Sequence, residues 1–534
     1  MSGQVTRIDA KELKARLHDG GEIALLDARE ELPFGRRHLL MASCVPLSRL
    51  ELLLDDLVPR RATRVVWCDD NEGLAARAAA RASALGYQNV ALLDGGIAAW
   101  EAAGFRVYSG VHVASKAFAE VVEHEAGTPW ISAEELQALI DRKADIAIYD
   151  SRSFEEYHNN SVPTAISVPG AELVYRFADL APSPATTVIV NCGGRTRSII
   201  GAQSLINAGV SNKVVSLKDG TMAWHLAGLD VVHGATQRPP DVTPRGLEAA
   251  QERAARVAER HGIARIDRQT LDAWRAEAGQ RSLYLLDVRT PEEYEAGHLR
   301  GARLAPGGQL VQETDSHMAT WGARVVLVDG DGVRATMTAS WLKQMGWPDV
   351  AVLVSGQADG DRVTGQHSPR VLGLDAAIVQ SIAATDLRDR LAAGPVAVID
   401  LDLSRRHALG HIPGAWFAIR SRLGEGLAKL SPGQSVVLTS PDGVLAQLAV
   451  AELQTAARVP VMALTGGTRA WVQAGLPLES GMARMIDAAD DVFLSPRERG
   501  QNREDAMREY LTWEINLVRD MATDDDHRFR IVAG

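Results

Sequence analysis

Four continuous runs of apolar residues, each ending in an aspartate, mark the chain at separate places. They are Leu25-Leu26-Asp27, Ile148-Tyr149-Asp150, Leu285-Leu286-Asp287 and Val398-Ile399-Asp400. Runs without polar alternation are typical of strands that are buried on both faces of a parallel sheet. Segments with helical spacing, such as 10–17, 74–85 and 445–453, fall between such runs. The order strand, helix, strand predicts an α/β fold with an open, doubly wound, mostly parallel sheet and helices on both faces.

The spacing that follows each run is nearly constant, which indicates an internal repeat. The same interval leads from the aspartate to a loop position in each of the first three units, and a slightly shorter interval does so in the fourth. The residues at that loop position are, in chain order, Asp69, Cys192, Asp329 and Ser440. In three of the units a tryptophan follows the loop position at an almost constant distance, at Trp100, Trp224 and Trp471. The second unit is therefore distinguished by a thiol.

The repeat divides the 534 residues into four domains, because a chain of this length is too long for one hydrophobic core. We expect the domains at 1–110, 125–235, 263–365 and 375–480. A linker and helix are expected at 236–262, where Gln237-Arg238-Pro239-Pro240 precedes a segment of helical composition at 247–261. This linker is predicted to divide the chain into two pairs of units.

The C-terminal extension at 481–534 contains no fifth repeat. Its Ser495-Pro496-Arg497-Glu498 resembles a capping box with proline at the first helical position, and apolar residues recur at helical spacing after it. We predict a helix that packs on one of the domains. A helix that binds a partner protein is the alternative.

Composition places the chain among soluble globular proteins, with 46% hydrophobic and 23% charged residues. No stretch has the length of a membrane span, and the segment 1–26 lacks the apolar core of a signal peptide, so a cytoplasmic location is expected. Three cysteines cannot form a disulfide framework, and no paired Cys or His motif appears, so neither a metal nor another cofactor is expected. The net charge of −11 disfavours a nucleic-acid partner.

The candidate reactive group is Cys192, although a lone cysteine is often merely a buried apolar residue. Its loop reads Cys192-Gly193-Gly194-Arg195-Thr196-Arg197-Ser198, after the apolar run 187–190 and before a helical segment at 199–208. Backbone N–H groups, a helix N-terminus and two guanidinium groups favour a thiolate there. Arg195 and Arg197 are the cations expected to attract a small anion that the net charge would otherwise repel.

Residues outside the loop are further candidates. Asp150 and Arg152, at the end of the preceding strand, are expected to orient the loop or line its mouth, with Arg152 as a candidate for substrate binding; a structural ion pair is the alternative. Arg176 is a candidate for the rim of the site, and a solvated surface position is its alternative. Cys68 aligns with Asn191, one residue before the reactive position, so a structural role is expected and a sulfur-accepting thiol is the alternative. A structural role is also expected for Cys44, and Tyr175 and Lys218 are further candidates for the rim.

These motifs resemble the rhodanese family of sulfurtransferases over nearly the whole chain up to about residue 480. The second unit carries Asp150-Ser151-Arg152, Glu155-Glu156-Tyr157 and Gly220-x-x-x-Trp224 beside the Cys192 loop. The third and fourth units carry Gly297-His298-Leu299-Arg300-Gly301-Ala302 and Gly410-His411-Ile412-Pro413-Gly414-Ala415. The resemblance implies four tandem rhodanese-like domains, of which the second is active and the other three are not.

The resemblance also implies a ping-pong reaction. Cys192 would take a sulfane sulfur from an anionic donor such as thiosulfate, become a persulfide, and pass the sulfur to a thiophilic acceptor. The N–H groups from Gly193 to Ser198 would stabilise the charge on the persulfide. Cyanide, glutathione, another small thiol or a carrier protein would each satisfy this chemistry as acceptor.

The Cys192 loop differs from the loops of related proteins, and two hypotheses about function remain. Arg195 stands where the family loop often has glycine, and the two-arginine loop disfavours mercaptopyruvate as the donor. Four residues separate Cys192 from Arg197, whereas the related phosphatases have five, which argues against phosphate ester hydrolysis. The leading hypothesis is a sulfurtransferase with one working site. The alternative is a sulfane-sulfur-binding or scaffold protein built of degenerate domains that does not turn over.

Overall fold

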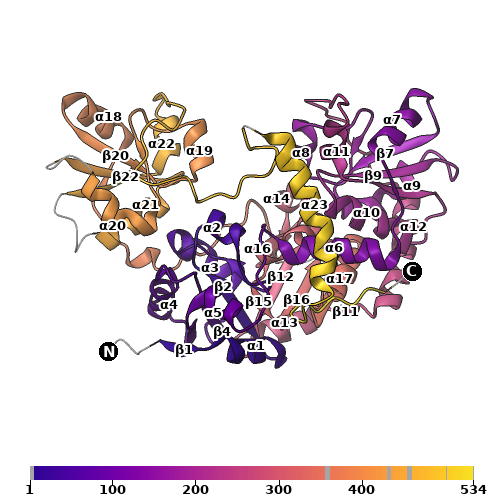
Figure 1. Ribbon diagram of the computed structural model, residues 1–534, viewed down its shortest axis with the longest axis horizontal. Helices are drawn as coiled ribbons and strands as arrows, with labels where there is room; N and C mark the ends of the chain where they lie inside the picture. The colour runs from indigo at the N-terminus through magenta and orange to yellow at the C-terminus, as the bar shows by residue number, and fades with distance from the viewer. Residues whose placement is uncertain (1–4, 355–360, 430–433, 454–459, 501, 533–534) are drawn as a thin grey trace.

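The computed structural model describes residues 5–354, 361–429, 434–453, 460–500 and 502–532. Within them, the four repeats form four α/β units with one common strand order (Figure 1). Numbering the five core strands of a unit in chain order, the sheet runs first, fifth, fourth, second, third, and all its neighbours are parallel. The predicted fold class is confirmed.

The first two units have the following elements. The first contains β1 (Thr6–Ile8), α1 (Ala10–His18), β2 (Ile23–Asp27), α2 (Glu31–Arg36), β3 (Ser43–Cys44), α3 (Leu50–Leu57), β4 (Arg64–Cys68), α4 (Leu74–Ala84), β5 (Asn89–Leu93) and α5 (Gly96–Ala102). The second contains β6 (Trp130–Ile131), α7 (Ala133–Asp141), β7 (Ile146–Asp150), α8 (Phe154–Asn159), β8 (Ile166–Ser167), α9 (Glu172–Leu180), β9 (Thr187–Asn191), α10 (Thr196–Asn207), β10 (Val214–Leu217) and α11 (Gly220–Leu226).

The other two units follow the same plan. The third contains β11 (Ala264–Ile266), α13 (Arg268–Ala276), β12 (Leu283–Asp287), α14 (Pro291–Ala296), β14 (Arg303–Leu304), α15 (Gly307–Gln312), α16 (Thr314–His317), β16 (Arg324–Val328), α17 (Val333–Gln344) and β17 (Asp349–Leu353). The fourth contains β19 (Ser381–Ile382), α18 (Ala384–Ala393), β20 (Val396–Asp400), α19 (Ser404–Leu409), β21 (Trp416–Phe417), α20 (Leu423–Gly426), β22 (Ser435–Thr439), α21 (Val444–Leu453), β23 (Val461–Leu464) and α22 (Gly467–Gln473).

Local sequence signals explain where α8 and its counterpart in the third unit, α14, begin. Ser153 caps α8 and forms a reciprocal capping box with Glu156, and Thr290 does the same for α14 with Glu293. The three repeated tryptophans are buried within the last helix of their units. In each, the indole N–H donates to the carbonyl oxygen six residues further on, so these residues close the end of the unit rather than line a site.

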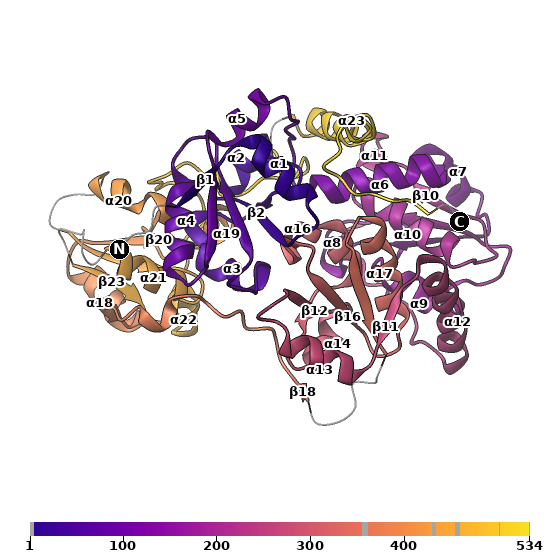
Figure 2. The ribbon, with the colours of Figure 1, turned by 90° about the horizontal axis from the view of Figure 1, so that it is seen from below.

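Contacts between the units do not follow the two pairs predicted from the linker. The linker helix α12 (Pro244–His261) packs on α9 of the second unit and on α17 of the third, so it joins these two units. The strand β15 (Thr320–Trp321) of the third unit pairs antiparallel with β2 of the first. Arg420 of the fourth unit forms a buried ion pair with Glu51 of the first, at 2.6 Å. Figure 2 shows the fourth unit beside the first, at the far end from α12.

Two helices outside the repeats meet on the second unit. They are α6 (Val113–Ala126) and α23 (Arg503–Met521), which pack against each other (Figure 1). The predicted docking of a C-terminal helix is confirmed, but the helix does not begin at Ser495. The backbone N–H groups of Ser495 and Glu498 close a turn there, and Asn502, with φ of 61°, stands immediately before α23.

No helix among the described residues is long and apolar enough to cross a membrane.

Candidate active site

Cys192 lies directly after β9, at the carboxyl end of the central strands of the second sheet, where loops of parallel sheets form ligand sites. Cys192 is 2% exposed, and its Sγ lies 3.5 Å from the Ser198 Oγ. The Ser198 hydroxyl donates to the carbonyl oxygen of Arg195 at 2.8 Å, which leaves its own oxygen as an acceptor toward Sγ. The first turn of α10, which includes Ser198, therefore contacts the thiol.

The first turn of α11 binds the backbone of the Cys192 loop through hydrogen bonds. Thr221 N–H donates to the carbonyl oxygen of Cys192 at 2.9 Å, and Met222 N–H donates to that of Gly193 at 3.2 Å. Gly220 has φ of +55°, and a Cβ at this position would stand 2.4 Å from the Cys192 carbonyl oxygen. The glycine of the Gly-x-x-x-Trp motif is thus required both by conformation and by the close approach of the loop.

Asp150 and Arg152 form a buried, bidentate ion pair below the loop. The Arg152 Nε and one terminal nitrogen donate to the two carboxylate oxygens at 2.8 and 2.7 Å. Asn191 donates to the same carboxylate at 2.9 Å, and Arg152 also donates to the carbonyl oxygen of Asn160 at 2.5 Å. A Cβ placed on Gly193 would lie 3.8 Å from the Arg152 side chain. This pair supports the loop and forms part of its wall.

Arg195 is bound by carboxylates rather than presented to a small anion. Its guanidinium donates to Glu120 at 2.7 and 2.8 Å and to Asp219 at 2.8 Å, and also to Glu123. Burial disfavours its charge, but these carboxylates outweigh burial and raise the pKa of Arg195 above its ordinary value. The charge expected to attract an anion is neutralised here, and Arg195 tethers the loop to α6.

Arg197, in the first turn of α10, is shared between two units. Its guanidinium donates to both carboxylate oxygens of Glu156 at 2.6 and 2.7 Å and to Gln309 of the third unit at 2.9 Å. Burial opposes its charge, but Glu156 outweighs burial and raises the pKa of Arg197, with a further contribution from Cys192. Like Arg195, Arg197 is therefore paired with a carboxylate rather than presented to a small anion.

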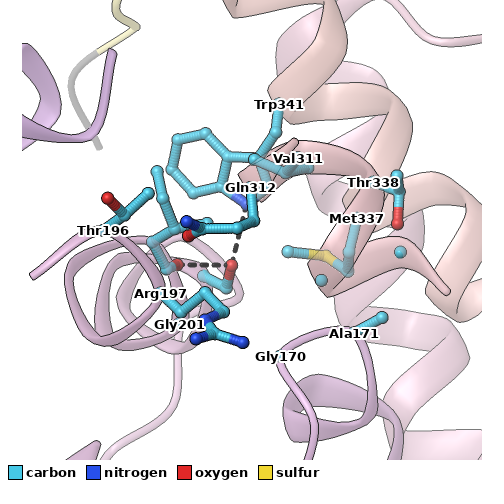
Figure 3. A pocket seen from close by; sticks show the side chains of 14 residues that line it. Gly170, Ala171, Thr196, Arg197, Gly201, Val311, Gln312, Met337, Thr338 and Trp341 are labelled. Carbon is cyan, nitrogen blue, oxygen red and sulfur yellow. Dashed lines mark hydrogen bonds between the residues drawn. The ribbon is translucent and has the colours of Figure 1, made fainter. Parts of the chain in front are cut away.

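A small cavity of about 20 Å³ lies beside Arg197, between α10 and the third unit's α15 and α17 (Figure 3). Thr196 and Trp341 line it, and the Trp341 N–H donates to Ser204 at 2.8 Å. A space of this size holds about one water molecule, so it does not admit a substrate. It is part of the contact between the second and third units.

Arg334 of the third unit makes the equivalent contacts, with a carboxylate of its own unit and with a residue of the second unit. Arg334 donates to Glu293 of its own unit at 2.7 Å and to Glu172 of the second unit at 2.8 Å. Each unit thus sends one arginine into the other, which fixes the two loops relative to each other.

The C-terminal extension covers the Cys192 loop from the other side. Thr196 donates to buried Glu514 at 2.8 Å, and a Cβ on Gly194 would stand 3.5 Å from Glu514 and 3.6 Å from Tyr510. Arg497 donates to the carbonyl oxygen of Gly193 at 2.5 Å. Sequence reasoning missed these residues and Glu120, because they lie outside the repeated motif.

Arg176 lies away from this loop. It donates to Glu172 at 2.6 Å and to the carbonyl oxygen of Pro240 at 3.0 Å, and it lines a cavity of about 530 Å³ between the second and third units. Tyr175 packs on Arg334, with the guanidinium carbon 4.3 Å from the ring centroid, and Lys218 lies 4.2 Å over the ring of Trp130. None of the contacts between described residues joins Arg176, Tyr175 or Lys218 to Cys192.

A family model for the rhodanese-like domain matches residues 9–103, 132–227, 268–359 and 383–474. The chain belongs to the rhodanese family. The expected four tandem rhodanese-like domains are confirmed. Because the matches fall on all four repeats, the degenerate units are rhodanese domains as fully as the second is.

The known proteins that are similar to this rhodanese match either a stretch about as long as one domain or the whole chain. A crystal structure of thiosulfate sulfurtransferase from Pseudomonas aeruginosa is 48% identical, with a TM-score of 0.96 over 99% of this chain and 100% of that one. An HTH-type transcriptional regulator of Mycobacterium tuberculosis is 32% identical over 110 residues, which are 20% of this chain and 48% of the regulator, or about half its length. The uncharacterized protein YqhL of Bacillus subtilis is 34% identical over 88 residues, 16% of this chain and 68% of that protein.

The degenerate rhodanese domains show what their loop binds. Asp69 accepts the N–H of Ala75, six positions later, at 2.9 Å, and Asp329 accepts that of Ala335 at 2.9 Å. Asp69 also accepts a second loop N–H, from Asn71, at 3.0 Å. In the fourth domain the Ser440 hydroxyl accepts the N–H six positions later at 3.3 Å. The rhodanese loop is thus a cradle for an anionic or polar acceptor, and two domains fill it with their own carboxylate.

The remaining cysteines of this rhodanese lie in the first domain. Cys68 pairs with Asp27 in the sheet as Asn191 pairs with Asp150, which confirms the predicted register. Burial raises the pKa of both the Cys44 and Cys68 thiols well above the ordinary value. Because the thiolate is the nucleophile, burial disfavours reaction at these two thiols.

Proposed function

We propose that this rhodanese is a sulfurtransferase that carries a sulfane sulfur as a persulfide on Cys192. The observation that carries the proposal is the internal comparison of the four loops. Carboxylates occupy the cradle in the first and third domains, whereas the second domain places a thiol there. The full-length similarity to a thiosulfate sulfurtransferase supports this reading.

The reaction is a double displacement with thiosulfate as the donor. The Cys192 thiolate attacks the outer sulfur of thiosulfate, a new S–S bond forms, and the S–S bond of thiosulfate breaks. Sulfite leaves with the electron pair of that bond. A thiol or cyanide then attacks the outer sulfur of the persulfide, and the Cys192 thiolate is regenerated.

The loop stabilises the negative charge that develops on the terminal sulfur. By the register of the other domains, the Ser198 N–H is the donor equivalent to those of Ala75 and Ala335. The N-terminus of the twelve-residue helix α10 adds partial positive charge in the same place. These donors are fixed before the reaction, so stabilising the persulfide needs no reorganisation.

Mass spectrometry of the intact protein after incubation with thiosulfate tests this proposal. We expect the wild type to gain one sulfur atom, because the described chain has one cysteine in a cradle. Cys68→Ser, the matched control, is expected to gain one sulfur as well. Loading that survives Cys192→Ser would contradict the proposal.

Turnover separates the two functional classes. Because the active form is a group carrier, sulfur on Cys192 is expected to pass to acceptors in a panel of cyanide, glutathione and other small thiols. Comparison of thiosulfate, mercaptopyruvate and glutathione persulfide as donors completes the assay. The burial of Cys192 favours the alternative of a sulfur-binding protein, and loading without acceptor-dependent turnover would establish that alternative.

A further inference from the structure

We infer that Arg497 of the C-terminal extension binds the charged oxygens of an anionic sulfur donor at Cys192, so that this extension completes the site of the second domain. The inference rests on the proposed sulfur transfer and adds to it the residue that recognises the donor.

The extension reaches the second domain by way of the first. The carbonyl oxygen of Asp490 accepts the N–H of Leu32 at 3.1 Å, and Phe493 N–H donates to Glu31 at 2.9 Å. Beyond these anchors on α2, the chain contacts the Cys192 loop through Arg497. It then enters α23 (Figure 1). Arg497 therefore arrives from a segment that is held at both ends.

Arg497 contacts the loop itself. It donates to the carbonyl oxygen of Gly193 at 2.5 Å, to the Asn160 side chain at 3.2 Å, and to the hydroxyl oxygen of Thr221. All three acceptors are neutral. They hold the guanidinium in place without neutralising its charge.

The charge balance distinguishes Arg497 from the other arginines of the site. Arg152, Arg195 and Arg197 each form an ion pair with a carboxylate. Among the described residues, no carboxylate lies within ion-pair distance of Arg497. A partly buried cation without a counter-ion is unfavourable, and a bound anion relieves that cost.

Electrostatics agrees with this geometry. Burial, followed by repulsion from Arg152, lowers the pKa of Arg497 to about 10, whereas the Cys192 charge opposes this shift. Arg497 still carries its proton at neutral pH. The site thus holds a charged guanidinium that has no direct carboxylate partner among the described residues and that contacts the residue next to the reactive cysteine.

Thiosulfate fits this arrangement chemically. With its outer sulfur facing Sγ, its three oxygens face away from the thiol, where a guanidinium fork can bind two of them. When the S–S bond of thiosulfate breaks, the leaving sulfite keeps both negative charges. Arg497 therefore stabilises the donor and the leaving group, and a neutral side chain would do neither.

The test compares Arg497→Gln with Arg499→Gln on two donors. Arg499 is the matched control because it is an exposed arginine of the same segment, packed on Phe493. Thiosulfate has two negative charges, and methanethiosulfonate has one but presents the same sulfur. In Arg497→Gln we expect kcat/KM to fall about 10- to 100-fold with thiosulfate and about threefold with methanethiosulfonate. Arg499→Gln is expected to stay within about twofold of wild type.

Each outcome decides a separate point. Equal kcat/KM in the two variants would overturn the inference, and so would an equal loss on both donors, which would indicate a merely structural role. Partial recovery of thiosulfate kcat/KM in Arg497→Lys supports it, since lysine restores charge but not the fork. A wild type that gains no sulfur would instead overturn the proposed function. Thermal unfolding of each variant separates these results from misfolding.

Discussion

Replacement of Cys192 by aspartate is expected to abolish sulfur transfer and to leave the fold as stable as the wild type. The first and third domains already hold an aspartate at this position, and its carboxylate accepts the loop N–H groups. Aspartate in the second domain should therefore fill the same cradle. We expect kcat to fall by about 10⁴-fold or more, because a carboxylate cannot form a persulfide.

Steady-state assays with thiosulfate and cyanide, together with thermal unfolding, measure both halves of this prediction. Cys192→Ser is the control that removes the nucleophile without adding charge. Residual activity of the aspartate variant near the wild-type level would contradict the role of Cys192. A reproducible fall in its Tm relative to Cys192→Ser would contradict the comparison with the other loops. In a chain of 534 residues, a loss of about 1 kcal/mol shifts Tm by less than the about 2–4 °C that is typical of 150–250 residues.

Substitution of Gly220 by alanine is expected to damage both stability and activity. The new Cβ would stand 2.4 Å from the Cys192 carbonyl oxygen, at a residue with φ of +55°. The loop must shift, and a displacement of the nucleophile by about 1 Å lowers rates by about 10²-fold. The strained backbone adds about 1–3 kcal/mol of destabilisation.

Gly228→Ala separates strain from collision. Gly228 has φ of +71° and no atom within 4 Å of its Cβ position, so alanine there meets the conformational penalty alone. We expect a loss of stability of about 1 kcal/mol and unchanged kcat/KM. Denaturant unfolding and thiosulfate kinetics measure both variants. Equal kcat/KM in Gly220→Ala and Gly228→Ala would show that the approach to the Cys192 carbonyl does not position the thiol.

The features that sequence could predict are those repeated in every domain. Apolar runs such as 187–190 became β9 because a central parallel strand is buried on both faces, and the position of Cys192 followed from counting between such runs. The helix after the loop was placed from 199, and the structure begins it at Thr196, three residues earlier. Four copies of one pattern made these predictions strong.

The features that could not be predicted from the sequence are contacts between segments far apart in the chain. The bond between Thr196 and Glu514 joins residues 318 positions apart, and the Arg195 pair with Glu120 spans 75. Such side chains have no periodic signature, and they occur once rather than in every unit. For that reason Arg195 was expected to face an anion although its charge is met by carboxylates of α6 and by Asp219.

The route of the C-terminal extension also orders events during synthesis. Arg497 contacts Gly193 across 304 positions of sequence, so the ribosome makes the Cys192 loop long before it makes the cover of that loop. A nascent chain that has reached the end of the fourth domain holds the cradle and its thiol, but not Tyr510 or Glu514. Translation therefore completes the contacts of this loop with Arg497, Tyr510 and Glu514 only after the four domains have been made.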